Sequence, residues 1–123
     1  MILCDTNIFI EIYRGNENVI DKLKAIGQEN IAISDVTSAE LLFGARNKNE
    51  LKIIKADINK LIEISINEEI SRIAVHLVEK SSLSHNLSLP DALIASTSII
   101  YDVKLYTLNM KDFKFLKNVK FVD

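Results

Sequence analysis

Three short apolar stretches of the sequence each carry a single acidic residue. They are ILCDTN with Asp5, TSAELLFGA with Glu40 and SLPDALIAS with Asp91, and a fourth acid, Asp112, follows in LNMKDF. Carboxylates that gather on one rim of a fold repel one another, which raises their pKa values unless a cation neutralises them. Because hard oxygen donors of this kind suit Mg²⁺ or Mn²⁺, the pattern indicates a metal site.

A site of this kind favours phosphodiester hydrolysis. One or two divalent ions can activate water and stabilise the leaving oxygen, and this chemistry needs neither a protein nucleophile nor a histidine base. His76 and His85 lack metal-ligand spacing with each other or with Cys4, which is interpreted as a small core residue. The sequence contains no glycine-rich phosphate loop and no Gly-x-Ser-x-Gly elbow.

Helix capping is the alternative explanation for each acid taken singly. TSAE has the form of a capping box, with Thr37 at the N-cap and Glu40 three residues on. SLPD and NMKD have the same form, so a first helical turn also accounts for Asp91 and Asp112. Asp5 differs, because it directly follows an apolar strand and the next two residues could cap the helix without it.

Short apolar strands alternate with helices along the chain, which predicts a parallel sheet covered on both faces. Strands are predicted over residues 2–5, 31–33, 61–66, 104–108 and 119–122. Helices are predicted over residues 7–15, 19–27, 38–47, 50–60, 68–82 and 91–102. Sites in such sheets form beyond the carboxyl ends of the strands. Since the acids follow strands or open helices, we expect them to converge on one rim.

Composition limits the class of protein. The 123 residues are 48% hydrophobic and 26% charged, which predicts a single globular domain over residues 1–123. One cysteine excludes an internal disulfide framework and fits a reducing compartment. No signal peptide is evident and no apolar stretch reaches the roughly 20 residues of a membrane span, so a cytoplasmic protein is expected. The net charge of −2 excludes a bulk positive footprint for nucleic acid.

Four motifs in order resemble those of PIN-domain ribonucleases. They are ILCDTNIFIEI, SAELLFGA, LPDALIASTSI and LYTLNMKDF, and the chain looks most like the VapC toxins of toxin–antitoxin pairs over essentially its whole length. The resemblance implies a Rossmann-like three-layer α/β/α fold with a mostly parallel central sheet. It also implies an Mg²⁺- or Mn²⁺-dependent endoribonuclease acting on RNA, often tRNA or rRNA. A homodimer and a VapB antitoxin that blocks the active-site groove are further implications.

The resemblance implies that Asp5, Glu40 and Asp91 are the core metal-binding carboxylates. It implies nearby hydroxyl or amide groups that orient a ligand or water, from Thr6, Asn7 and Thr107. In the family an acid often follows the last motif's threonine, whereas here that neighbourhood holds Asn109, with Asp112 one helical turn later. Asn109 is a neutral donor that would hold a second cation more weakly, so the fourth position is open between these two residues.

The expected mechanism is metal-dependent RNA hydrolysis, in which Asp5 and Asp91 hold the principal ion and Glu40 ligates it or orients the attacking water. Cations near the predicted rim would hold the flanking RNA backbone: Arg14, Arg46, Lys48 and Lys111. Two other classes remain open. One is a PIN-like module that binds RNA or protein with weak or no catalysis, which the Asn109 departure supports. The other is a receiver-type phosphoacceptor domain, although no adjacent acidic pair follows the first strand.

Overall fold

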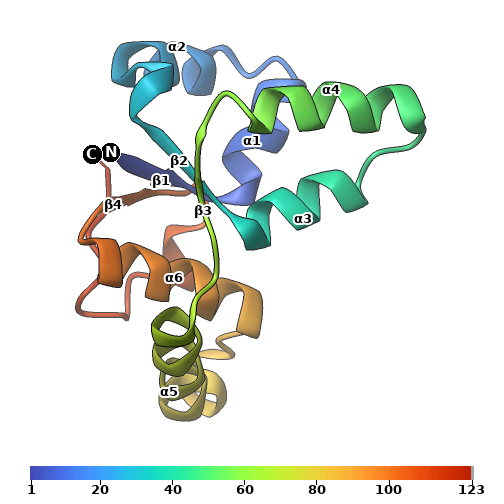
Figure 1. The fold of residues 1–123 in the computed structure, drawn as a ribbon. Coiled ribbons are helices and arrows are strands. Elements are labelled where there is room, and N and C mark those ends of the chain that lie inside the picture. The colour runs from blue at the N-terminus through green and yellow to red at the C-terminus, as the bar shows by residue number, and fades with distance from the viewer. Residues whose placement is uncertain (123) are drawn as a thin grey trace.

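The strands form one parallel sheet. The structure is a computed structural model that describes residues 1–122 (Figure 1). Its strands are β1 (Ile2–Cys4), β2 (Ile31–Ser34), β3 (Ile62–Ile64) and β4 (Lys104–Tyr106). They lie in the order β3-β2-β1-β4, and in the centre of the sheet Leu3 pairs with Ala32 on one side and with Leu105 on the other. The predicted parallel sheet is therefore confirmed.

The last predicted strand, over residues 119–122, is wrong as an extended element. This segment makes only an isolated parallel bridge between Phe121 and Leu105. Two backbone hydrogen bonds support the bridge, from Leu105 N to the Lys120 carbonyl at 2.8 Å and from Val122 N to the Leu105 carbonyl at 3.1 Å. On its other edge β4 pairs with β1 over three residues, whereas residues 119–122 pair with it only at Phe121.

Helices cover both faces of the sheet. They are α1 (Thr6–Tyr13), α2 (Glu17–Ile26), α3 (Asp35–Phe43), α4 (Lys48–Ile58), α5 (Glu68–His85) and α6 (Leu89–Tyr101). Two short 3₁₀ turns are added, η1 (Gln28–Asn30) and η2 (Met110–Asp112). In Figure 1, α1 to α4 lie on one side of the strands and α5 and α6 on the other, which confirms the three-layer α/β fold. None of the helices in residues 1–122 is long and apolar enough to cross a membrane.

Successive strand residues face opposite layers, as the two-residue period of a strand requires. Leu3 and Leu105 are fully buried against α5 and α6, in one hydrophobic cluster. Cys4 and Tyr106 belong to a second cluster, formed mainly with α1, α2 and the end of α4. Apolar side chains on both faces thus fix the carboxyl ends of β1 and β4, where the chain leaves the sheet.

Helix α3 begins three residues earlier than the sequence predicts. Ser34 is its N-cap, and the Ser34 hydroxyl accepts a hydrogen bond from Val36 N at 3.1 Å. Thr37 therefore lies inside the helix and Glu40 in its second turn, so the capping box assigned to TSAE is wrong. The physical reason is that β2 runs to Ser34, whose side chain caps the helix directly. Glu40 has no capping role that would explain its presence.

The other predicted caps have mixed outcomes. Ser88 is the N-cap of α6 and accepts a hydrogen bond from Asp91 N at 3.4 Å, which confirms the SLPD prediction. Asn109 precedes η2 but makes no side-chain cap hydrogen bond, so the NMKD prediction is wrong in that respect. Asp5 is itself the N-cap of α1 and accepts a hydrogen bond from Thr6 N, although the sequence also allowed the following two residues to cap the helix.

Candidate active site

Asp5 stands at the carboxyl end of β1 and is held by hydrogen bonds on both carboxylate oxygens. Oδ1 accepts from Thr6 N at 2.8 Å, and Oδ2 accepts from the Thr107 hydroxyl at 2.9 Å. The backbone N–H of Asp5 donates to the Tyr106 carbonyl at 2.9 Å, which extends the β1–β4 pairing by one bond. The side chain is only 5% exposed, so its position is fixed by the ends of two adjacent strands.

Asn7 joins the start of α1 to the loop after β4. Its Nδ2 donates to Asp5 Oδ2 at 3.3 Å, and its Oδ1 accepts from Leu108 N at 3.2 Å. The Thr107 hydroxyl also accepts from Asn109 N at 3.0 Å. The predicted supporting residues Asn7 and Thr107 therefore both contact Asp5 directly. They also hold the backbone of Leu108 and Asn109, which leads to the fourth acidic position.

Glu40 of α3 is held at the same rim by a hydrogen bond from Thr6, in the first turn of α1. The Thr6 hydroxyl donates to Glu40 Oε1 at 2.8 Å, and the Thr6 and Thr37 hydroxyl oxygens lie 3.1 Å apart. Thr37 is fully buried, whereas Glu40 is exposed. Sequence reasoning assigned Thr37 only to a helix cap and missed this contact. The sequence signal that could have revealed this contact is the spacing between Thr37 and Glu40, because residues three apart share a helix face.

Burial and the charges of the other acids raise the pKa of Asp91. Burial of its carboxyl group, reinforced by the negative charges of Asp5, Asp112 and Glu40, raises the pKa of Asp91 to about 6. Burial also raises the pKa of Asp5, against the opposing hydrogen bonds from Thr107 and Thr6, and the charges of Glu40 and Asp112 add to the rise. The four acids predicted from the sequence thus interact electrostatically at one end of the sheet.

Asp112 and Asn109 are not equivalent in this arrangement. The charge of Asp112 raises the pKa values of both Asp5 and Asp91. Asn109 is exposed, and its contact with the site within residues 1–122 is the backbone bond to Thr107. Electrostatically, Asp112 is the fourth member of the cluster.

The donor set fits a hard divalent cation. Within the described chain, none of the ion pairs involves Asp5, Glu40, Asp91 or Asp112, so no basic side chain is paired with these charges. As the side chains lie, residues 1–122 contain no group of three His, Cys, Asp or Glu residues arranged to hold a metal ion. Carboxylates and water together would have to complete a coordination sphere, which is the usual pattern for Mg²⁺.

The other nucleophilic and metal-ligating residue types have structural surroundings. Burial and the neighbouring Asp5 carboxylate raise the pKa of Cys4 to about 12, so its thiol stays protonated at neutral pH. The ring of His85 stacks on Phe115 with ring centroids 4.0 Å apart. His76 is exposed on α5.

A hollow of about 710 Å³ lies between α1, α3 and α4, and Glu40 is the one candidate carboxylate that lines it in the described chain. Glu40 forms part of its wall, and two of the predicted RNA-binding cations, Arg14 and Arg46, line it as well. Both are exposed and paired, Arg14 with Glu11 at 3.5 Å and Arg46 with Glu50 at 2.7 Å. Lys48 and Lys111 are exposed but do not line this hollow.

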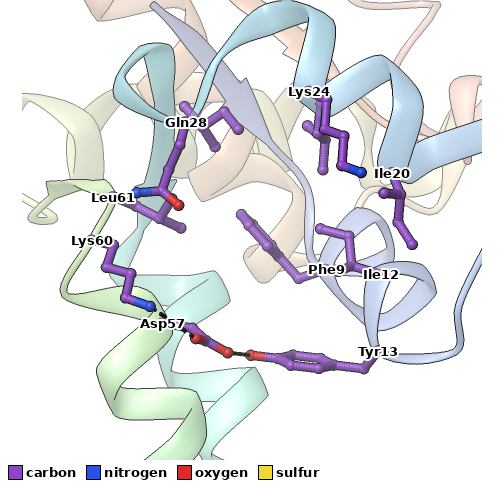
Figure 2. A pocket seen from close by; sticks show the side chains of 11 residues that line it. Phe9, Ile12, Tyr13, Ile20, Lys24, Gln28, Asp57, Lys60 and Leu61 are labelled. Carbon is purple, nitrogen blue, oxygen red and sulfur yellow. Dashed lines mark hydrogen bonds and ion pairs between the residues drawn. The ribbon is translucent and has the colours of Figure 1, made fainter.

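A second hollow, of about 500 Å³, lies away from the carboxylates. Figure 2 shows its floor of apolar side chains from α1, among them Phe9 and Ile12, with Lys24 and Lys60 at its edge. A hydrogen bond of 2.7 Å from the Tyr13 hydroxyl to Asp57 closes one side and joins α1 to α4. This hollow contains no residue predicted to be catalytic.

Comparison with known proteins identifies relatives over the whole chain. Residues 2–118 match the PIN domain family. The chain is similar to Ribonuclease VapC19 of Mycobacterium tuberculosis, with 31% identity over 98% of each chain.

Two solved structures are also similar. A chain of a toxin–antitoxin complex from Klebsiella pneumoniae is 29% identical, with a TM-score of 0.83 over 97% of this chain and 95% of that one. A chain of VapBC2 from Rickettsia felis, bound to a DNA fragment from its promoter, is 26% identical, with a TM-score of 0.81 over 99% and 98%.

Proposed function

The chain belongs to the PIN-domain family and, within it, to the VapC ribonucleases, and from this premise we propose that it is a metal-dependent endoribonuclease neutralised by a VapB-like antitoxin. The observation that supports the metal dependence is the group of four acids at the carboxyl end of the sheet. Two of their pKa values are raised, and within residues 1–122 none of the ion pairs involves these acids. Family membership excludes the receiver-type alternative. It leaves a catalytically weak PIN-like binding module as the rival.

Asp5, Asp91 and Glu40 would hold Mg²⁺ or Mn²⁺, with Asp112 completing the negative rim. When bound, such an ion polarises a phosphate and lowers the pKa of coordinated water. Both carboxylate oxygens of Asp5 accept hydrogen bonds, so its orientation in the site is fixed. Asp91 lies in the first turn of α6, and Glu40 accepts a hydrogen bond from the Thr6 hydroxyl. The chain's own contribution is thus to carry the three carboxylates on ordered elements, the N-cap of α1, the second turn of α3 and the first turn of α6.

The RNA would approach through the hollow that Glu40 shares with Arg14 and Arg46. Guanidinium groups there can hold phosphates on either side of the scissile bond. Their ion pairs with Glu11 and Glu50 lie at the surface, where water and salt screen the attraction, so phosphate can displace them. A single-stranded or loop segment, as in tRNA or rRNA, fits such a surface better than a duplex.

The partner proposal has separate support. The solved relatives come from a toxin–antitoxin complex and from VapBC2, and we infer a VapB-like antitoxin for this chain. A protein segment seated in the hollow beside Glu40 would exclude RNA from the carboxylates. A homodimer and action in the cytoplasm, where RNA and antitoxin meet, complete the proposal.

Metal removal is the direct test of this function. Purified protein, freed of antitoxin, should cleave a structured tRNA or rRNA fragment with Mg²⁺ or Mn²⁺, and EDTA should stop the reaction. Adding back excess Mg²⁺ should restore cleavage. Cleavage that continues at full rate in EDTA contradicts the metal dependence. Metal-independent RNA binding without cleavage across a broad RNA panel would favour the binding-module alternative.

Substitutions at the fourth acidic position separate its two candidates. Asp112→Asn should reduce cleavage by about 10–100-fold, the range typical of residues that support metal ligands, while Asn109→Ala should change it little. The same Asp112→Asn change should lower the pKa of Asp91, because it removes a neighbouring negative charge. Carboxyl ¹³C NMR titration in EDTA measures that pKa. A larger loss of cleavage in Asn109→Ala than in Asp112→Asn would reverse the assignment.

A further inference from the structure

We propose that Thr37 is a positioning residue that directs the proton of the Thr6 hydroxyl onto Glu40 and so holds the Glu40 carboxylate at the rim. This inference rests on the proposed function, because it assigns Thr37 a part in cleavage through Glu40. Thr37 does not touch substrate or metal in this proposal. It acts through Thr6.

The geometry places three oxygen atoms in a row. Thr37 Oγ1 lies 3.1 Å from Thr6 Oγ1, which lies 2.8 Å from Glu40 Oε1. Thr37 is fully buried, and Thr6 is the one hydrogen-bond partner of its hydroxyl in the described chain. Thr37 and Glu40 are three residues apart on α3, so both face the start of α1.

The number of available protons decides which hydroxyl group donates in each of these two hydrogen bonds. A threonine hydroxyl has one proton to donate, while an ionised carboxylate only accepts. If Thr6 donates to Thr37, then Glu40 loses its donor and the buried Thr37 proton has no acceptor among residues 1–122. If Thr37 donates to Thr6, then Thr6 can donate to Glu40 and every group is satisfied. An unsatisfied buried polar group costs about 1–3 kcal/mol, so the second arrangement wins.

The row links two of the candidate carboxylates. The backbone N–H of Thr6 donates to Asp5 Oδ1 at 2.8 Å, while its side chain donates to Glu40 Oε1. Thr6 therefore links Asp5 to Glu40 through two hydrogen bonds. The Thr37 proton fixes the orientation of the Thr6 hydroxyl in the second of them. Hydrogen bonds in such a row polarise and strengthen one another. Without the Thr37 donor, the Thr6 hydroxyl can turn away and release Glu40.

Thr37→Val tests the proposal, because valine keeps the shape of threonine and removes the hydroxyl. We expect kcat for cleavage of a short RNA to fall roughly 3- to 10-fold, the equivalent of one hydrogen bond, with KM nearly unchanged. Thr37→Ser, which keeps the donor, should restore most of kcat. Thr97→Val is the matched control: Thr97 is equally buried, and its hydroxyl donates to the Leu93 carbonyl at 2.7 Å within α6. Its kcat should stay at the wild-type value.

A second measurement needs neither metal nor RNA. Three-bond NMR couplings of the Thr6 side chain, recorded in EDTA, should report one χ1 rotamer in the wild type and in Thr37→Ser. They should report averaged rotamers in Thr37→Val. If Thr37→Val fails to fold, Thr37→Ala removes the same hydroxyl without a branched side chain and takes its place.

Three results would overturn the proposal. They are a kcat for Thr37→Val equal to that of Thr97→Val, a failure of Thr37→Ser to recover activity, and an unchanged Thr6 rotamer in Thr37→Val. If the wild-type protein cleaves no RNA, the proposed function fails on its own. The rotamer measurement still decides in that case whether Thr37 orients Thr6.

Discussion

Asp91→Asn is expected to remove cleavage while making the metal-free protein more stable at neutral pH. Asparagine keeps the shape of the side chain, and the start of α6 is capped by the Ser88 hydroxyl through Asp91 N, a bond that does not use the carboxylate. Activity should fall by at least about 100-fold, since even residues behind metal ligands cost about 10–100-fold. Stability should rise because a half-buried charge beside three other acids is removed.

The pH dependence of this stability gain has a definite sign. The folded protein raises the pKa of Asp91 from 3.8 to about 6, so it binds the proton more tightly than the unfolded chain. The stability that this proton provides is fully present below the unfolded value and is lost as pH rises through about 6. The advantage of Asp91→Asn should therefore be largest above about pH 7 and smallest near pH 4.

Thermal unfolding in EDTA across this pH range measures the effect on stability, and RNA cleavage with Mg²⁺ measures the effect on activity. Equal unfolding temperatures at every pH would show that Asp91 does not interact with the other acids. A variant that cleaves as well as the wild type would remove Asp91 from the proposed mechanism and leave it only as part of a helix start.

Asp5→Asn should lose cleavage to a similar extent but gain no stability. Asparagine offers one acceptor oxygen where Asp5 offers two, and both Asp5 oxygens accept hydrogen bonds. If the amide nitrogen of the new asparagine takes the place of Oδ1, two donors face each other, this nitrogen and the N–H of Thr6. At the Oδ2 position it faces Nδ2 of Asn7, whose Oδ1 is already engaged by Leu108 N.

Either orientation leaves a partly buried donor without an acceptor, at a cost of up to about 3 kcal/mol that offsets the relief of repulsion. The metal-free unfolding temperature of Asp5→Asn at pH 7.5 should therefore lie at or below that of the wild type. The comparison with Asp91→Asn under the same conditions provides the control. A stability gain equal to that of Asp91→Asn would mean that the hydrogen bonds to Asp5 contribute little.

The layout of the sheet could be predicted because strand–helix alternation has few solutions. The start of α3 could not, because Ser34 and Thr37 are both acceptable caps by residue type. The structure differs from the prediction because β2 continues to Ser34, which leaves no room for a linker before the helix. That shift of three residues moved Thr37 from an exposed cap to a buried contact with Thr6.

The convergence of the acids followed from one rule, that sites lie beyond the carboxyl ends of parallel strands. The ranking of Asn109 and Asp112 did not follow. The NMKD pattern indicates a helical turn there, but it does not specify that η2 carries the charge of Asp112 close to Asp5 and Asp91. The short bridge at Phe121 shows the same limit. Local patterns suggest a strand there, but the path of the chain beside β4 in the folded protein decides how much of it pairs.

The hydrogen bond between Thr107 and Asp5 joins residues 102 positions apart, and the one between Leu108 and Asn7 spans 101. A chain still being synthesised cannot form either bond until the segment after β4 has left the ribosome. The hydrogen bonds that hold the Asp5 carboxylate and the Asn7 amide oxygen therefore form only after these distant segments have folded together. Because the chain is made from its N-terminus, its first acidic motif alone cannot assemble the site.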